Sequence, residues 1–171
     1  MSTPKRILFL GATLAIVGVS VGILALFRVQ EAKEFSRPHQ VQTRGGTNFV
    51  LRLIETSVGR VDTGFVVIVY MRLENPNAFS FEVRRNRFVL SGEGRDVFRP
   101  TTMGTQDELI KMPPNGVLDR EMLSYVVPDE VIDGILELRI GRNYRILIKE
   151  RGAFAGRLAP GQFRSFHRPS W

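Results

Sequence analysis

The segment GFVVIVYMRL, residues 64–73, is the stretch of sequence that decides the fold. It is a nearly continuous apolar run rich in β-branched residues, which is typical of a strand at the centre of a sandwich. Just after the run, Asn75-Pro76-Asn77 has the residue types of a turn. Upstream, residues 48–55 (NFVLRLIE) are also apolar and β-branched, so they predict a second strand.

The rest of the chain continues in short apolar runs separated by turn residues. Residues 79–90 alternate in part between apolar and polar side chains, and Gly92-Glu93-Gly94 predicts a hairpin into residues 95–99. Residues 103–116 predict a long loop that ends in PPNG. The further predicted elements are strands at residues 117–127, 134–140 and 144–149 and a short helical turn at residues 128–132.

About seven short strands with turn signals between them predict a mainly β fold, an antiparallel immunoglobulin-like β-sandwich. The Cys…Trp…Cys core pattern of antibody domains is absent, because the chain contains no cysteine. The same absence excludes a disulfide framework, thiolate metal sites and a cysteine nucleophile.

The order of these motifs resembles known sandwich families. A long apolar strand ending in an Asn-Pro-Asn turn (residues 66–77) and followed by an aromatic-rich strand resembles the late-embryogenesis-abundant/water-stress domains. The PPNG turn, the next strand and Tyr125-Val126-Val127-Pro128 look like small sandwich domains of bacterial lipoproteins and signal-anchored exported proteins of unassigned function. The resemblance covers residues 47–150. It implies a sandwich with a non-enzymatic, membrane-tethered role, and it brings no functional residues with it.

Residues 7–27, ILFLGATLAIVGVSVGILALF, are 21 residues without a charge. A helix of this length spans roughly 32 Å, which matches a hydrocarbon core of about 30 Å. Lys5 and Arg6 precede the segment and Arg28 follows it. A cleavable signal peptide has a shorter apolar region of about 7 to 15 residues and a small-residue cleavage site. The segment therefore predicts an uncleaved, single transmembrane helix.

Small residues at helical spacing mark one face of this predicted helix. Two of them, Gly18 and Gly22, form a GxxxG pair, which allows close helix–helix approach in lipid. The alternative is that glycine and alanine are simply common in membrane helices. We favour a helix-packing face made of Gly11, Ala15, Gly18, Gly22 and Ala25.

The orientation of the predicted helix depends on the charged residues that flank it, and the charges on its two sides favour opposite orientations. A short basic N-tail before a first hydrophobic segment favours a bacterial inner-membrane protein with its domain on the periplasmic side, and the cytoplasmic side remains the alternative. The chain as a whole is expected to consist of five segments. They are a basic N-tail (1–6), the transmembrane helix (7–27), a juxtamembrane stalk (28–46), the β-sandwich (47–150) and a basic aromatic tail (151–171).

The C-terminal tail combines arginines and aromatic residues and contains no acidic residue. It shows no period, so it predicts irregular structure. Arginine with aromatics is enriched at protein contacts and also suits a membrane interface, so partner docking leads, with lipid contact and a solvated end as alternatives. The residues expected to make partner contacts are Arg151, Phe154, Arg157, Phe163, Arg164, Phe166, Arg168 and Trp171.

The net charge of +7 and the pI of about 10.5 favour anionic partners. Catalytic, metal-binding and cofactor-binding residues are not predicted. The two histidines, His39 and His167, lack a second ligand at metal-site spacing and are predicted to be exposed polar residues. The acidic pairs Asp107-Glu108 and Asp129-Glu130 lie in predicted loop or turn segments and read as solvated.

Nucleic-acid binding is also not predicted. Arg84, Arg85 and Arg87 next to Phe88 form a basic cluster with an aromatic residue. On a strand, however, Arg84 and Arg85 face opposite sides, so the cluster divides between two faces. Neither face then supplies the groove or stacking platform that nucleic acid requires.

The sequence as a whole predicts a non-enzymatic structural or accessory subunit of a larger membrane complex. Its partners are expected to be other transmembrane helices and subunits, with anionic lipid headgroups as a further contact. An energy-converting complex, respiratory or photosynthetic, is one host that fits this organisation. The alternative is a membrane-tethered envelope module that captures a peptide, lipid or small ligand through the loops of the sandwich. An enzyme is disfavoured, because acid–base and nucleophilic groups do not converge in the sequence.

Overall fold

The computed structural model describes residues 37–43, 45–93, 97–101, 108–141, 144–149 and 158–167. These residues are mainly β, in antiparallel sheets, as predicted. The predicted membrane segment and its packing face lie outside the described ranges. Within those ranges, no helix has the length and apolar character needed to cross a bilayer.

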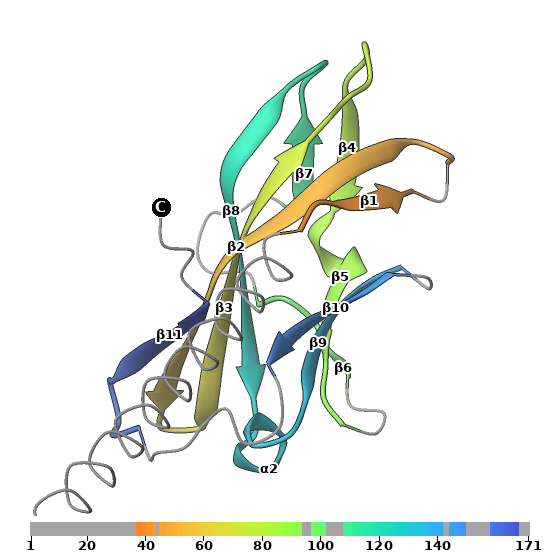
Figure 1. Cartoon of the computed structure of the whole chain (residues 1–171). Helices are drawn as coiled ribbons and strands as arrows, with labels where there is room; N and C mark the ends of the chain where they lie inside the picture. Colours follow the sequence, from red (N-terminus) through yellow and green to blue (C-terminus); the bar gives the residue numbers. More distant parts are fainter. Residues whose placement is uncertain are drawn as a thin grey trace, which may run out of the picture. The chain divides into compact units, whose positions relative to one another are not determined.

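One layer is a five-stranded antiparallel sheet built around a long hairpin. The hairpin strands β2 (Asn48–Val61) and β3 (Gly64–Glu74) pair along their whole length, and β8 (Val117–Val127) pairs with the other side of β3. Two short strands share the remaining edge of β2. Figure 1 shows β1 (His39–Gln42) and β11 (Phe163–His167) along different stretches of that edge. We call this layer the hairpin sheet.

The second layer consists of two smaller sheets. The four-stranded sheet has the order β10-β9-β5-β6, and the two-stranded sheet pairs β4 with β7. The ring of Phe49 on β2 packs against Phe81 of β4 and Phe88 of β5, so both sheets face the hairpin sheet. The bounds are β4 Phe81–Arg84, β5 Phe88–Ser91, β6 Val97–Phe98, β7 Leu109–Met112, β9 Leu136–Ile140 and β10 Tyr144–Lys149. We call this layer, in which Arg139 of β9 and Arg145 of β10 lie opposite each other, the arginine layer.

Two short helical turns connect the strands. The 3-10 turn η1 (Arg85–Arg87) joins β4 to β5, and α2 (Asp129–Ile132) follows β8 at the lower end of Figure 1. The helical turn predicted after residue 127 is therefore confirmed. Pro128 precedes α2 with an extended backbone, so the strand ends there and the turn begins with two acidic residues.

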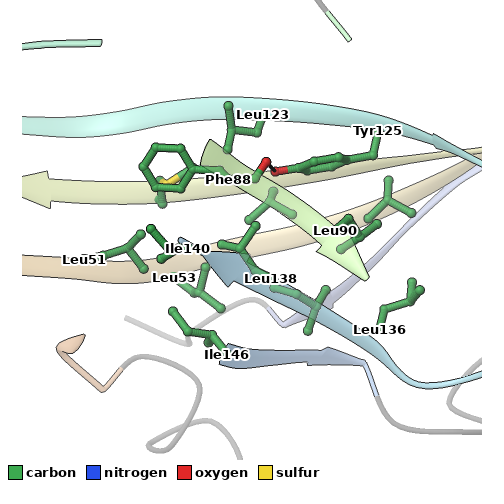
Figure 2. Close-up of a cluster of buried hydrophobic side chains, with 14 of the residues drawn as sticks. Leu51, Leu53, Phe88, Leu90, Leu123, Tyr125, Leu136, Leu138, Ile140 and Ile146 are labelled. Atoms are coloured by element: carbon green, nitrogen blue, oxygen red, sulfur yellow. Dashed lines mark hydrogen bonds between the residues drawn. The ribbon is translucent and has the colours of Figure 1, made fainter. Parts of the chain in front are cut away.

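The core lies between the two layers. A β-bulge between Leu53 and Glu55 adds a residue to β2, so the buried positions change from odd numbers such as Leu53 to even numbers such as Thr56 and Val58. The bulge keeps one face of a fourteen-residue strand against the core while the sheet twists. Figure 2 shows the central cluster, in which Leu51, Leu53, Leu123 and Tyr125 meet Phe88, Leu90, Leu136, Leu138, Ile140 and Ile146.

A buried hydrogen bond crosses the core between the two layers. The hydroxyl of Tyr125 on β8 donates to the carbonyl oxygen of Phe88 on β5 at 3.1 Å, and Figure 2 shows the two groups pointing toward each other. Burial raises the pKa of the Tyr125 hydroxyl above its usual value, because the phenolate would lose its hydration. The hydroxyl therefore stays protonated and keeps its role as donor.

At one end of the sandwich, the two turns that the sequence singled out meet. Asn75 follows β3 and is 2% exposed. Its side-chain amide nitrogen donates to the carbonyl oxygens of Phe79 and Pro113, at 2.9 and 2.7 Å. Its side-chain oxygen accepts from the backbone and side-chain nitrogens of Asn77, at 2.9 and 2.8 Å. One amide therefore ties the Asn-Pro-Asn turn to the PPNG turn.

The other end is closed by a buried lysine. Lys149 ends β10 directly after a bulge, which leaves it 2% exposed beside buried Ile148. Its Nζ donates to the carbonyl oxygen of Gly134, just after α2, at 2.7 Å. Burial lowers the pKa of Lys149, and the nearby carboxylates of Asp133 and Glu93 oppose that shift.

Several predicted strands have the bounds that the structure shows. Residues 117–127 form β8 and residues 144–149 form β10, and the hairpin predicted at Gly92-Glu93-Gly94 joins β5 to β6. The strand predicted over residues 79–90 is interrupted, because η1 separates β4 from β5. Phe79, predicted to share a face with Phe81, instead lies in the preceding loop and is 55% exposed.

Three other predictions are wrong within the described residues. The long loop predicted over residues 103–116 contains β7, whose partner β4 lies far away in sequence. The stalk predicted over residues 28–46 contains β1, and the irregular tail contains β11. β7 and β11 pair with strands far away in the sequence, and such pairing leaves no local period. β1 pairs with β2, the next strand along the chain, but its four residues are mostly polar and give no strand pattern.

Candidate interaction surface

The outer face of the hairpin sheet carries apolar side chains that the core does not use. On β3, Val67, Val69 and Met71 are fully buried in the core. The residues between them therefore point to the opposite face of the sheet. Val66 and Ile68 are two of these, and they begin two rows of residues that run across the sheet.

The first row crosses four strands. Phe163 of β11 opposes Gly59 of β2, Gly59 opposes Val66 of β3, and Val66 opposes Val126 of β8. Phe163 is 58% exposed and Val126 is 41% exposed. Gly59 has a steric role, because a Cβ there would lie 2.3 Å from the Phe163 ring. Glycine thus leaves room for the aromatic ring to lie on the sheet.

The second row contains small polar and apolar residues. Ser165 opposes Ser57, Ser57 opposes Ile68, and Ile68 opposes Ser124. The hydroxyl of Ser165 also forms a hydrogen bond with the carboxylate of Glu55. Neither row contains a charged residue, so the two together form an uncharged strip across the sheet. Val66, Gly59 and Ser124 are buried within it, and the exposed apolar residues are Phe163 and Val126 at the two ends of the first row. We call these eight residues the uncharged strip.

Paired charges flank the uncharged strip on one side. The guanidinium of Arg120 lies 4.4 Å from the centre of the Tyr70 ring, and its Nη2 is 3.4 Å from Glu55. Farther from the strip, Arg72 contacts Glu74 at 3.0 Å and Asp119 at 2.9 Å. Exposed pairs of this kind contribute little to stability, about 0 to 1 kcal/mol each, but they neutralise the charges locally.

Another paired arginine, Arg60, lies on the core-side face of β2, because it opposes Phe65 of the core in the register. It is 2.8 Å from Asp129 of α2, and its guanidinium lies 4.7 Å from the centre of the Phe65 ring. On the face that carries the uncharged strip, Arg72 and Arg120 have carboxylate partners within the chain. A partner that docks on the strip does not need to supply a charge.

Two carbonyl groups on the outer edge of β8 are occupied. Arg85 donates to the carbonyl oxygen of Met122 at 3.0 Å and forms an ion pair with Glu121. The backbone nitrogen of Thr101 donates to the carbonyl oxygen of Ser124 at 2.8 Å. Such contacts protect an edge strand against pairing with another chain. This part of the β8 edge is therefore protected against pairing with another strand.

Of the tail residues predicted to make partner contacts, Phe163 and Arg164 are described by the structure. Both lie on β11, so this part of the tail pairs with the chain's own sheet and does not extend freely. Phe166 belongs to the same strand. The other predicted contacts of the tail, and the whole helix-packing face, lie outside the described residues.

The polar residues that the sequence singled out do not converge. His39 lies on β1 and is half-buried, contrary to the exposed position predicted for it, and its buried Nε2 has no hydrogen-bond partner among the described residues. Burial lowers its pKa, and the charge of Arg37 adds to the effect. His167 lies on β11. In the described ranges, no three potential metal-ligating side chains come together.

The sequence-based interpretation missed the uncharged strip. A signal for it was present on β3, where both sets of alternating residues are apolar. The apolar run predicts a strand at the centre of a sandwich, whereas in the structure one of its two sets of side chains faces away from the core. The contribution of Phe163 had no local signal, because it depends on the pairing of β11 with β2.

Comparison with protein-family models, curated proteins and solved structures found no match to this chain.

Proposed function

We propose that the protein is a non-enzymatic accessory subunit that is anchored in a bilayer and docks on a larger membrane protein complex. The uncharged strip is the observation that carries this proposal. Phe163 and Val126 are exposed apolar residues of one cross-strand row, and the flanking arginines are already neutralised. Exposed aromatic and apolar residues beside charges that are paired within the chain are a composition found at protein–protein interfaces.

The membrane anchor in this proposal is the apolar segment at residues 7–27. Its small-residue face contacts a transmembrane helix of the complex, while the sandwich covers a neighbouring soluble surface. The sandwich is proposed to be immunoglobulin-like, in keeping with the resemblance to water-stress and signal-anchored exported domains. The location proposed is the bacterial inner membrane, with the domain on the periplasmic side. A respiratory or photosynthetic assembly is one suitable host.

Substitution at the β8 end of the strip tests the proposal. Val126→Arg places a charge at an exposed position, so the domain should fold while docking is lost. Val97→Arg is the matched control, because Val97 is 51% exposed on β6 of the other layer. After extraction in mild detergent, native sizing should show wild type and Val97→Arg in a large particle and Val126→Arg as a free 19.4 kDa chain in its micelle. A wild-type chain that migrates alone at native expression contradicts the proposal.

The alternative is a tethered binding module, and a specific observation supports it. Phe79 is 55% exposed and Val117 is 41% exposed at the end of the sandwich where Asn75 holds two turns in place. A rigid loop end with exposed apolar residues suits capture of a peptide, lipid or small ligand. Phe79→Asp should then abolish binding, while Val126→Arg and Leu at Gly18 and Gly22 should have no effect. The accessory-subunit proposal predicts the reverse.

A further inference from the structure

The outer face of the arginine layer differs in charge from the uncharged strip. Leu138 and Ile140 of β9 and Ile146 of β10 are buried in the core. By alternation, Arg139 and Arg145 point to the opposite, outer face. The register places these two arginines directly opposite each other on adjacent strands. Like charges in this arrangement repel, so the fold itself does not explain the pair.

Arg139 also has an unused hydrogen-bond donor. Its Nε is buried and has no hydrogen-bond partner among the described residues. The nearest carboxylate, from Glu137 on the same strand, lies 3.7 Å away, which is too long for a hydrogen bond. A buried donor without an acceptor is costly, so the position of Arg139 is a further feature that the fold itself does not explain.

The positive charge extends over the two-stranded sheet of the same layer. Val83 on β4 and Ile110 on β7 are buried, so their neighbours Arg84 and Lys111 point outward and are exposed. Glu82 opposes Lys111 in the register. Within the described ranges, however, neither Arg84, Lys111 nor Arg145 comes within ion-pair distance of a carboxylate. The face thus carries four cationic side chains and two carboxylates, Glu82 and Glu137.

An exposed apolar residue accompanies these charges. Leu147 follows Arg145 by two positions on β10, so it lies on the same face, and it is 46% exposed. An apolar side chain among arginines is the combination that binds anionic membrane surfaces, through buried apolar area and electrostatic attraction.

We propose that the outer face of the arginine layer, centred on Arg139, Arg145 and Leu147, binds anionic lipid headgroups of the membrane that carries the chain. The inference rests on the anchor of the proposed function. Residues 28–38 between the apolar segment and β1 extend at most about 40 Å, so the domain stays near the bilayer surface. Electrostatic attraction acts over about 8 Å at physiological salt, so the face binds when the domain lies down on the membrane.

The absence of cysteine in the chain allows a direct test. Leu147→Cys is labelled with a fluorophore, and the full chain is reconstituted into phosphatidylcholine vesicles with or without phosphatidylglycerol. Lipids with a quencher near the headgroup report contact. Val126→Cys is the matched control, because Val126 has similar exposure on the hairpin sheet. We expect at least about threefold stronger quenching at position 147 in the anionic vesicles, lost at high salt, and no change at position 126.

Arginine variants identify the groups responsible. Arg139→Gln with Arg145→Gln should reduce the quenching at position 147 to the level in neutral vesicles. Arg145→Gln alone, at an exposed position that cannot disturb the core, should reduce it in part. Equal quenching in the two vesicle types, stronger quenching at position 126, or no effect of either variant overturns the proposal. A label at position 147 that responds to soluble polyglutamate and not to phosphatidylglycerol also overturns it, in favour of an acidic protein partner.

Flotation of the vesicles separates this inference from the function on which it rests. A chain that floats with both vesicle types but shows no anionic preference at position 147 contradicts only the lipid-binding face. A chain that floats with neither vesicle type lacks the anchor, which contradicts both proposals. Assembly into a complex is measured separately by native sizing.

Discussion

The two ends of the sandwich are closed by different chemistry. At the first end, Asn75 is a neutral amide with two donated and two accepted hydrogen bonds. At the second end, Lys149 is a cationic amine that donates to the carbonyl oxygen of Gly134. Both residues are 2% exposed. The two side chains are equally buried, but the free energy required to bury them differs. Removing a charged group from water costs far more than removing an amide whose groups are all paired.

The difference predicts which end depends on pH. The Asn75 amide does not titrate, so the first end keeps its hydrogen bonds at any ordinary pH. The pKa of Lys149 is lowered by burial, so the folded state binds that proton less tightly than the unfolded chain does. The second end is therefore both less stabilising and more sensitive to conditions. Four substitutions test this comparison, beginning with the largest expected effect.

Asn75→Ala should destabilise the domain by about 3 kcal/mol. The substitution removes four hydrogen bonds and leaves the carbonyl oxygens of Phe79 and Pro113 without their donor in a buried site. Urea unfolding of the full chain in detergent, followed by β-sheet circular dichroism, measures the loss. Asn86→Ala, at an exposed position in η1, is the control and should change stability by less than about 0.5 kcal/mol. Similar losses for the two variants would show that the turns do not depend on the Asn75 amide.

Tyr125→Phe should cost about 1 to 1.5 kcal/mol, because the ring is kept and one buried hydrogen bond between the layers is lost. It also changes the response to alkali. The pKa of Tyr125 is raised in the folded state above its ordinary value of 10.0, so the wild type loses stability as the pH rises beyond that value. The variant lacks this loss. Unfolding midpoints that decline in parallel for both proteins above pH 10 would contradict the assignment.

Lys149→Met should leave stability within about 1 kcal/mol of wild type near pH 7, because the removal of a costly buried charge offsets the loss of the interactions that the ammonium group makes. The diagnostic result is the pH slope. The unfolded chain holds the Lys149 proton up to its ordinary pKa of 10.5, so raising the pH toward that value stabilises the wild type relative to the variant. Urea midpoints between about pH 7 and about pH 9.5 measure this difference. A constant difference across that range would show that the lysine does not titrate differently on folding.

Asn115→Gly should have the smallest effect, within a few tenths of a kcal/mol of wild type. Asn115 has a φ of 47° in the PPNG turn, a conformation that glycine adopts without a steric penalty. The gain in backbone fit is offset by the greater freedom of glycine in the unfolded chain. A loss above about 1 kcal/mol would mean that the Asn115 side chain, and not the Asn75 amide alone, holds the first end. Asn115→Val is the opposite control and should be clearly destabilising.

The sequence allowed the regular parts of the fold to be predicted. The strand pattern of β3, β8 and β10 is visible locally, because long apolar runs bounded by turn residues have few other interpretations. The turns at Asn75-Pro76-Asn77 and PPNG were also visible. Their contact was not, because it depends on a hydrogen bond from Asn75 to Pro113, 38 residues away.

The candidate surfaces were harder to predict than the strands. In the sequence, Arg139 and Arg145 are two arginines among many, and only the register of β9 with β10 places them opposite each other. Likewise, the net charge of +7 indicates an anionic partner but not which face binds it. On the outer face of the hairpin sheet, Arg72 and Arg120 are paired with carboxylates, whereas Arg139 and Arg145 oppose each other on the arginine layer, and this difference separates a neutral face from a positive one.

The sequence by itself determined the β-rich class of the domain, most of its turns and the expectation of a membrane anchor at residues 7–27. These properties follow from composition and period over a few consecutive residues. The tertiary structure alone decided that β7 and β11 are strands, that Gly59 makes room for Phe163, and that Arg139 and Arg145 lie on a different sheet from the uncharged strip. Such features arise from pairing between distant segments, where the energy of a contact depends on residues that local sequence does not bring together.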